Sequence, residues 1–105
     1  MSIAGKKLGI LISVSPEHPS FLHGVRTAKA ALGRGVTVYL YCIDEGVRGV
    51  AHPELQALRS QGLILYACAY GAQQRRLPMG DQATYAGLTL VNDLLAGTDR
   101  FVSFN

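Results

Sequence analysis

The stretch LILYACAY at residues 63–70 is the part of this 105-residue chain that decides its fold class. It is short and almost entirely apolar, as is typical of a strand that is covered on both faces within a parallel sheet. Short apolar runs of the same character occur at residues 8–14, 36–43 and 101–104. Their spacing along a chain of this length predicts one α/β domain, residues 1–105.

The segments between these runs have helical patterns. Ser20 is expected to cap a first helix that Gly33 ends. Pro53 suits the first turn of a second helix, which runs to Gln61. A third helix is predicted over residues 82–96, which gives the order β-α-β-α-β-α-β. Because crossovers are right-handed and place helices on both faces, we expect a three-layer α/β sandwich with a mostly parallel, flavodoxin-like or Rossmann-like sheet.

Composition and charge narrow the classes of function. The net charge is +3, and the only basic doublets are at residues 6–7 and 75–76. No basic stripe suits a phosphate backbone, so direct nucleic-acid binding is not expected. No run approaches the roughly 20 apolar residues of a membrane span, so we expect no membrane association. Cys42 and Cys68 lie on separate predicted strands with no secretion signal before them, which favours free thiols in the cytoplasm.

Cys68 is the leading candidate for chemistry, because it lies at the downstream end of the predicted strand at residues 63–70. Parallel sheets bind ligands at the carboxyl ends of their strands, so we expect this thiol to meet solvent between the loops at residues 14–20, 43–53 and 69–81. Cations near a thiol favour the thiolate, which is the nucleophile in sulfur transfer. The residues that we predict to bind a substrate or partner in these loops are Ser15, Asp44, Gln73, Arg75 and Arg76.

Both cysteines also have a purely structural interpretation. Cysteine behaves as a small apolar residue in buried strands, and Cys68 is open to this reading. Cys42 lies between Tyr41 and Ile43 within a predicted strand, and no basic loop follows it. We therefore interpret Cys42 as an inert core residue.

Several familiar sites are absent from the sequence. No glycine-lysine loop follows the first predicted strand, and the glycines of residues 33–35 end a helix rather than open one, so neither nucleotide fingerprint is met. No paired Cys or His spacing indicates zinc. Ser13 and Ser15 lack the Gly-x-Ser-x-Gly turn of the α/β-hydrolases. We expect no metal and no cofactor.

The chain resembles the sulfur-relay family typified by DsrE, DsrF and TusD, which includes YchN-like relatives. The resemblance covers nearly the whole chain and rests on residues 7–12, 28–32, 44–47, 63–68 and 99–104. A basic residue, Arg75, also follows Cys68 after about seven positions. Members of this family are α/β domains that assemble into trimers and hexamers. Some of them hold transferred sulfur as a persulfide on a cysteine after this strand, and Cys68 matches that position.

The resemblance implies a sulfur carrier rather than a turnover enzyme. Cys68 would accept sulfur as a persulfide from one protein and pass it to another, in a sulfur-relay or sulfur-oxidation pathway and within a homo- or hetero-oligomer. The alternative is an oligomeric small-ligand module in which Cys68 is structural and Arg75 and Arg76 bind an anion. A structural subunit of a mixed hexamer is a third interpretation, and the presence of Cys68 argues against it.

Overall fold

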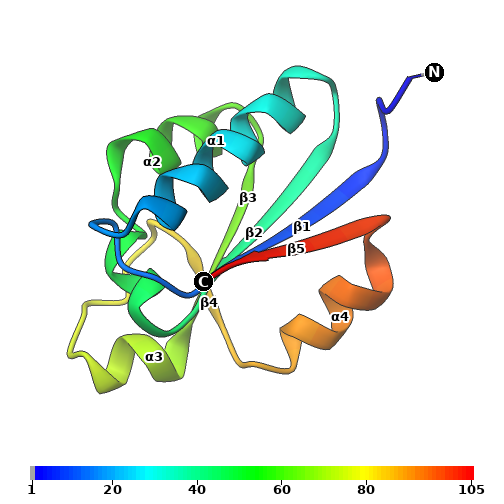
Figure 1. The fold of residues 1–105 in the computed structure, drawn as a ribbon. Helices are drawn as coiled ribbons and strands as arrows, with labels where there is room; N and C mark the ends of the chain where they lie inside the picture. Colours follow the sequence, from blue (N-terminus) through cyan, green and yellow to red (C-terminus); the bar gives the residue numbers. More distant parts are fainter. Residues whose placement is uncertain (1) are drawn as a thin grey trace.

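A five-stranded parallel sheet forms the middle layer of the computed structural model, which describes residues 2–105 (Figure 1). The strand order is β4-β3-β2-β1-β5, so the chain moves outward from β1 in one direction and returns to its other side with β5. This architecture confirms the predicted α/β fold with a parallel sheet. The strands are β1 (Lys7–Ile12), β2 (Thr37–Cys42), β3 (Ile64–Cys68), β4 (Thr84–Ala86) and β5 (Arg100–Phe104).

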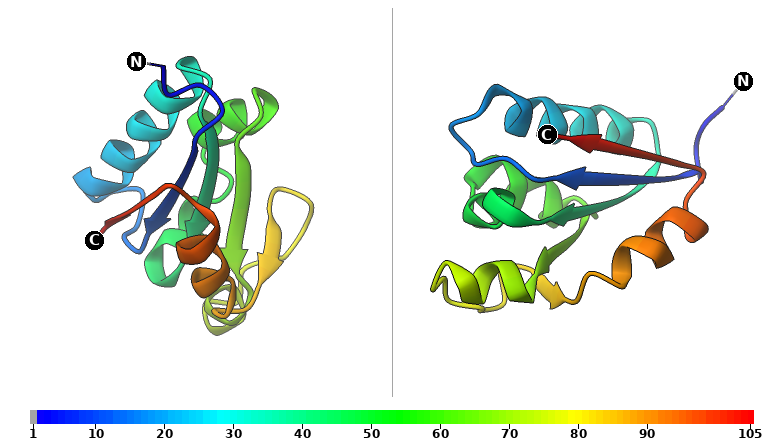
Figure 2. Two further views of the ribbon diagram at one scale, coloured as in Figure 1. Left: turned by 90° about the vertical axis from the view of Figure 1, so that its right-hand side faces the viewer. Right: turned by 60° about the horizontal axis from the view of Figure 1, so that its bottom comes forward.

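Helices cover the two faces of the sheet unequally. Helices α1 (Pro19–Gly33) and α2 (Pro53–Ser60) lie on one face, and α4 (Leu90–Gly97) lies on the other (Figures 1 and 2). A 3-10 helix, η1 (Asp44–Gly49), and the short helix α3 (Ala69–Gln74) follow β2 and β3 directly. Both therefore lie at the carboxyl edge of the sheet, toward which the strand arrows point in Figure 2.

The first two helices begin in the same way, with a histidine followed by a proline. His18 Nδ1 accepts a hydrogen bond from the Ser20 N–H at 3.1 Å, and Pro19 occupies the first helical position. The prediction that Ser20 caps α1 is therefore wrong, because the fixed φ of proline suits the first turn and lets the preceding residue act as the cap. At α2, His52 caps the Glu54 N–H at 3.1 Å, and the predicted start at Pro53 is confirmed.

The segment after β3 departs most from the prediction. The strand ends at Cys68 rather than Tyr70, and α3 occupies the first part of the predicted loop at residues 69–81. The predicted helix at residues 82–96 is also wrong, because β4 takes its first part and only Leu90–Gly97 is helical. Thr84 and Tyr85 favour a strand at the sheet edge, whereas the apolar spacing through residues 83–95 imitates a helix.

The core is densest between the sheet and the α1–α2 layer. Side chains on this face of β1 and β2 have no exposed surface: Ile10, Ile12, Val38 and Leu40. Alternate residues point to the opposite face, where Leu11, Tyr39 and Tyr66 are only half-buried beside the eight-residue α4. Among residues 2–105, no helix has the length and apolar character needed to cross a membrane.

Candidate functional site

Cys68 occupies the junction between β3 and α3 at the carboxyl edge of the sheet. It is the last residue of the strand and also caps the helix. Its Sγ accepts a hydrogen bond from the Gly71 N–H at 3.4 Å. Such a bond strengthens when the acceptor carries a negative charge. The turn from strand to helix therefore holds the sulfur in place with a donor aimed at it.

The Cys68 thiol is covered rather than open to solvent. The residue is only 3% exposed, which corrects the expectation that its strand-end position brings it to the surface. The reason is local: α3 begins at the next residue and folds over the strand end instead of leaving it as a loop. Its neighbour Tyr70 points the other way and is 64% exposed. Chemistry at this sulfur therefore requires α3 to move.

Tyr41 lies beside the thiol on the neighbouring strand. Its single hydroxyl hydrogen is shared between the carbonyl oxygens of Gly87 at 2.8 Å and Ala86 at 3.1 Å. Burial raises the pKa of the Tyr41 hydroxyl, and the adjacent Cys68 thiol raises it further. Tyr41 thus remains a neutral donor that ties β4 to the centre of the sheet next to the sulfur.

Arg75 closes the site from the far end of α3. Its Nε donates to Glu45 Oε2 at 2.6 Å, and its Nη1 donates to the Gly71 carbonyl at 3.1 Å. Glu45 also pairs with Arg48 at 2.7 Å. Hydrogen bonds from Arg75, and then from Arg48, hold the pKa of the Glu45 carboxyl below its ordinary value. Arg75 therefore neutralises the charge of the Glu45 carboxylate and links α3 to η1.

Helix α3 packs closely against η1 at Gly71. A Cβ at Gly71 would lie 3.4 Å from Val47 Cγ1 and 3.6 Å from the Asp44 backbone nitrogen. Asp44 itself is exposed and has a positive φ of 48° at the start of η1. Gly71 thus lies between Cys68, to which its N–H donates, and Arg75, which donates to its carbonyl, and it packs against the backbone of Asp44.

The other predicted site residues lie further from this arrangement. Gln73 and Arg76 are exposed, and Arg76 has a positive φ of 54° where α3 ends. Ser15 is half-buried, and its hydroxyl bond to the Glu17 carboxylate lowers the pKa of that group. Within residues 2–105, no hydrogen bond or ion pair links the side chains of these three predicted residues to Cys68.

Sequence reasoning missed the roles of Tyr41 and Glu45. For Tyr41 the position follows from the strand register: Cys42 pairs with Ala67, so Tyr41 and Cys68 are near neighbours on one face of adjacent parallel strands. No comparable signal exists for Glu45, because its pairing with Arg75 depends on how η1 and α3 pack.

Cys42 has a different environment from Cys68. It has no exposed surface and lies on the face packed against α1 and α2. Burial raises the pKa of the Cys42 thiol to about 12. Both cysteines are free in the structure. In the part of the chain that is described, no group of three or more His, Cys, Asp or Glu side chains is arranged to hold a metal ion.

This arrangement of strands and helices defines a DsrE-like α/β fold. A solved structure with the same fold is the crystal structure of the YchN protein from E. coli, with a TM-score of 0.79 and 16% sequence identity. The match covers 99% of this chain and 100% of that one. No protein-family model matches the sequence, and no curated protein matches it significantly. At this identity, the likeness supports the fold and leaves the function to be argued from the site.

Proposed function

We propose that the protein carries sulfur as a persulfide on Cys68 and passes it between protein partners. The observation that carries the proposal is the position of this sulfur at the junction of β3 and α3, with the Gly71 N–H directed at it. The sulfur lies at the end of its strand, where the six-residue helix α3 begins at the next residue. The resemblance of the chain to sulfur-relay proteins supports the same role.

The transfer chemistry needs only sulfur atoms and no external oxidant. The Cys68 thiolate attacks the outer sulfur of a donor persulfide, the sulfur–sulfur bond of the donor breaks, and the donor cysteine leaves as a thiolate. Cys68 then carries the outer sulfur. In the second step an acceptor thiolate attacks that sulfur, and the Cys68 thiolate is the leaving group. The Gly71 N–H stabilises negative charge on the Cys68 sulfur at both stages.

A partner protein would open the site by displacing α3. The helix is short, and the ion pair of Arg75 with Glu45 lies at the surface, where such pairs contribute little to stability. The exposed ring of Tyr70, two residues after Cys68 on α3, offers apolar surface to such a partner. We expect donor and acceptor to contact this surface in a reducing compartment such as the cytoplasm.

The protein is further proposed to assemble as a trimer or hexamer. Helix α4 buries only Leu94, whereas Leu88 is 55% exposed and Leu95 is 53% exposed. The sheet face beneath this layer also has half-buried aromatic residues. Apolar surface of this kind marks protein–protein contacts. The expected assembly is homo- or heteromeric, and a stable monomer at micromolar concentration by light scattering would contradict it.

The alternative, anion binding by the loops around Cys68, has less support. It needs free arginines, but Arg75 is engaged by the Glu45 carboxylate and by the Gly71 carbonyl. Arg76 alone is a single exposed charge at the end of α3. The sulfur carrier is therefore the function that this edge of the sheet supports better.

Mass spectrometry of the intact protein tests the carrier function. Incubation with a cysteine desulfurase and cysteine, or with a rhodanese and thiosulfate, should add about 32 Da, which a reductant removes because a persulfide is a labile adduct. Cys68→Ser should abolish the addition, and Cys42→Ser should keep it. Absence of sulfur uptake from both donors, or an adduct that persists in Cys68→Ser, would overturn the proposal.

A further inference from the structure

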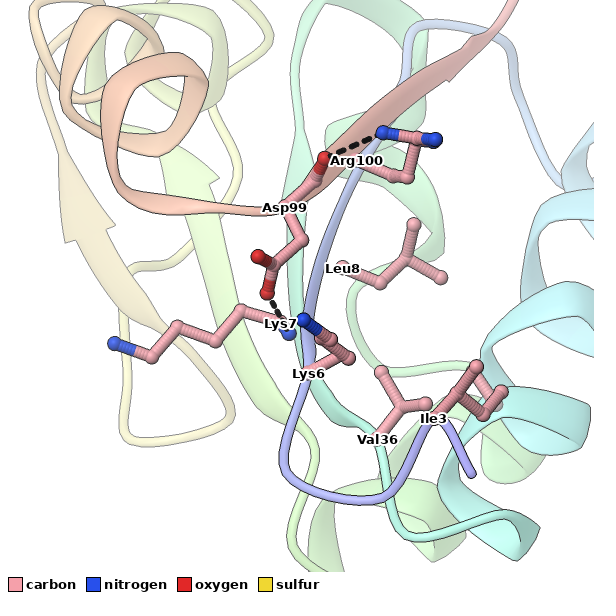
Figure 3. A pocket seen from close by; sticks show the side chains of 8 residues that line it. Ile3, Lys6, Lys7, Leu8, Val36, Asp99 and Arg100 are labelled. Atoms are coloured by element: carbon pink, nitrogen blue, oxygen red, sulfur yellow. Dashed lines mark hydrogen bonds between the residues drawn. The ribbon is translucent and has the colours of Figure 1, made fainter. Parts of the chain in front are cut away.

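A cavity of about 390 Å³ lies at the amino edge of the sheet, at the opposite end of the strands from Cys68. Its volume is within the range of small-molecule sites, roughly 300 to 1,000 Å³. Apolar side chains line much of it, and charged side chains lie at its rim (Figure 3). The apolar residues are Ile3, Leu8, Ala31 and Val36, and the charged residues are Lys6, Lys7, Asp99 and Arg100.

The cavity is built by segments that the fold holds in fixed positions. Leu8 and Arg100 are paired in register on β1 and β5, so their side chains share the face beneath α1. The amino-terminal segment is fastened by the Gly5 N–H, which bonds to the Gly35 carbonyl at 3.0 Å. The Thr37 N–H likewise bonds to the Lys6 carbonyl at 2.9 Å. The rim cations therefore belong to an ordered backbone.

The rim has an excess of positive charge. The Asp99 carboxylate accepts a hydrogen bond from the Lys7 backbone N–H at 2.8 Å, so one of its oxygens is already engaged. Arg100 uses Nη1 to donate to the Asp99 carbonyl at 3.1 Å, which leaves other guanidinium donors available. Over residues 2–105, neither Lys6 nor Arg100 forms an ion pair. The Lys7 side chain extends away from the apolar floor in Figure 3.

We propose that this cavity binds a small amphiphilic carboxylate, with its apolar body against Leu8, Ala31 and Val36 and its carboxylate between Lys6 and Arg100. The planar guanidinium of arginine matches a carboxylate in two-point contact. The last turn of α1, which includes Ala31, contributes the partially negative end of a helix. That end disfavours anions, and it disfavours a compact dianion such as phosphate more than a monoanion whose carboxylate lies at the rim beside the two cations. A monoanion with an apolar body fits both the charge and the lining.

Titration of the isotopically labelled, full-length protein with octanoate tests the site by NMR. Backbone amide shifts should concentrate at residues 6–8, Val36 and residues 99–100. Octanol, which keeps the apolar body without the charge, should bind about tenfold more weakly, and inorganic phosphate should bind more weakly still, because each lacks one of the two contacts. Octanol or phosphate binding as tightly as octanoate would overturn the proposal.

Matched variants distinguish this cavity from other apolar surface. Lys6→Met and Arg100→Met should each weaken octanoate binding about tenfold, since each removes a charged donor. Lys29→Met removes a cation from α1 that does not line the cavity and should leave binding unchanged. Ala31→Leu should also weaken binding by filling the floor, and leucine is well tolerated in a helix. Unchanged affinity in Lys6→Met and Ala31→Leu, or shifts confined to Leu88 and Leu95, would exclude the site.

The cavity and the thiol can be tested separately. Cys68→Ser should keep octanoate binding, because the two sites lie at opposite edges of the sheet. Loss of octanoate binding in that variant would contradict the proposed position of the ligand. Failure of the sulfur-carrier experiment would leave the expected octanoate results unchanged.

Discussion

The carboxyl edge of the sheet is covered, whereas the amino edge has a cavity. At the carboxyl edge, α3 covers Cys68, and Arg75 is paired with Glu45. At the amino edge, a cavity remains, and Lys6 and Arg100 have no carboxylate partner in the described part of the chain. Open α/β sheets commonly bind ligands at the carboxyl edge. In our proposals, the carboxyl edge holds a nucleophile that a partner uncovers, and the opposite edge binds a small anion.

The largest difference that we predict is between the two thiols. Cys42 has a pKa of about 12, so at pH 8 its thiolate fraction is roughly three orders of magnitude below that of an ordinary thiol. It is also covered by the α1–α2 layer, so its alkylation should require global unfolding. Cys68 needs only local opening of α3, which costs less free energy. Native-state alkylation followed by peptide mapping should therefore modify Cys68 at least about tenfold faster.

The dependence of the two alkylation rates on urea tests this difference between the thiols. Low concentrations of urea should accelerate the reaction of Cys42 more steeply than that of Cys68, because global unfolding exposes more surface than local opening does. Equal rates and equal urea dependence would mean that the carboxyl edge opens only with the whole domain. The proposal that a partner displaces α3 would then fail.

The same substitution at the two edges should have opposite effects on stability. A Cβ at Gly46, in η1, would lie 2.3 Å from the Ile12 carbonyl oxygen, so Gly46→Ala forces the backbone to shift. We expect a loss of about 3 kcal/mol in the free energy of unfolding. Gly33 ends α1 with no atom within 4 Å of the corresponding position. Gly33→Ala should stabilise by about 0.5 kcal/mol, because alanine favours the helix.

Urea denaturation of both glycine variants provides the measurement. The two variants serve as controls for each other, since the chemical change is identical and only the surroundings differ. A loss of less than about 1 kcal/mol in Gly46→Ala would show that η1 is loosely held against β1. The description of the carboxyl edge as the closed one would then need revision.

The apolar runs predicted most of the sheet because each buried strand carries its own signal. The run at residues 63–70 predicted β3, and the run at residues 101–104 predicted β5. Strand β4 was missed because it is only three residues long and its apolar neighbours continue at helical spacing. What anchors it is the Tyr41 hydroxyl, which bonds to the carbonyls of Ala86 and Gly87. A contact between distant parts of the chain leaves no local pattern.

The candidate site was predictable in position but not in environment. The end of an apolar run placed Cys68 at the carboxyl edge, where the structure has it. Its burial was missed because α3 is too short to give a helical period. The Arg75 pairing with Glu45 and the cavity between Lys6 and Arg100 both join residues far apart in the chain. Such features follow from packing, which the spacing of single residues does not encode.

The smallest effect that we predict concerns the ion pair that fastens α3. Glu45→Gln should raise the hydrogen-exchange rate of the Gly71 amide about two- to fivefold at pH 7, because surface ion pairs contribute little. Glu54→Gln, which alters an exposed carboxylate on α2, should leave that rate unchanged.

The pH dependence of this effect has a definite sign. Folding lowers the pKa of the Glu45 carboxyl from its ordinary value of 4.5, so its stabilising contribution is fully present above that value. It is lost as the pH falls through the lower pKa of the folded state, where the carboxyl becomes protonated. Wild type and Glu45→Gln should therefore converge in Gly71 exchange, corrected for the intrinsic rate, as the pH falls below the lowered pKa of Glu45. If the two exchange rates still differ in acid, the effect of Glu45→Gln does not come from the lost charge. The absence of any difference at pH 7 would show that Arg75 does not hold the closed edge in place.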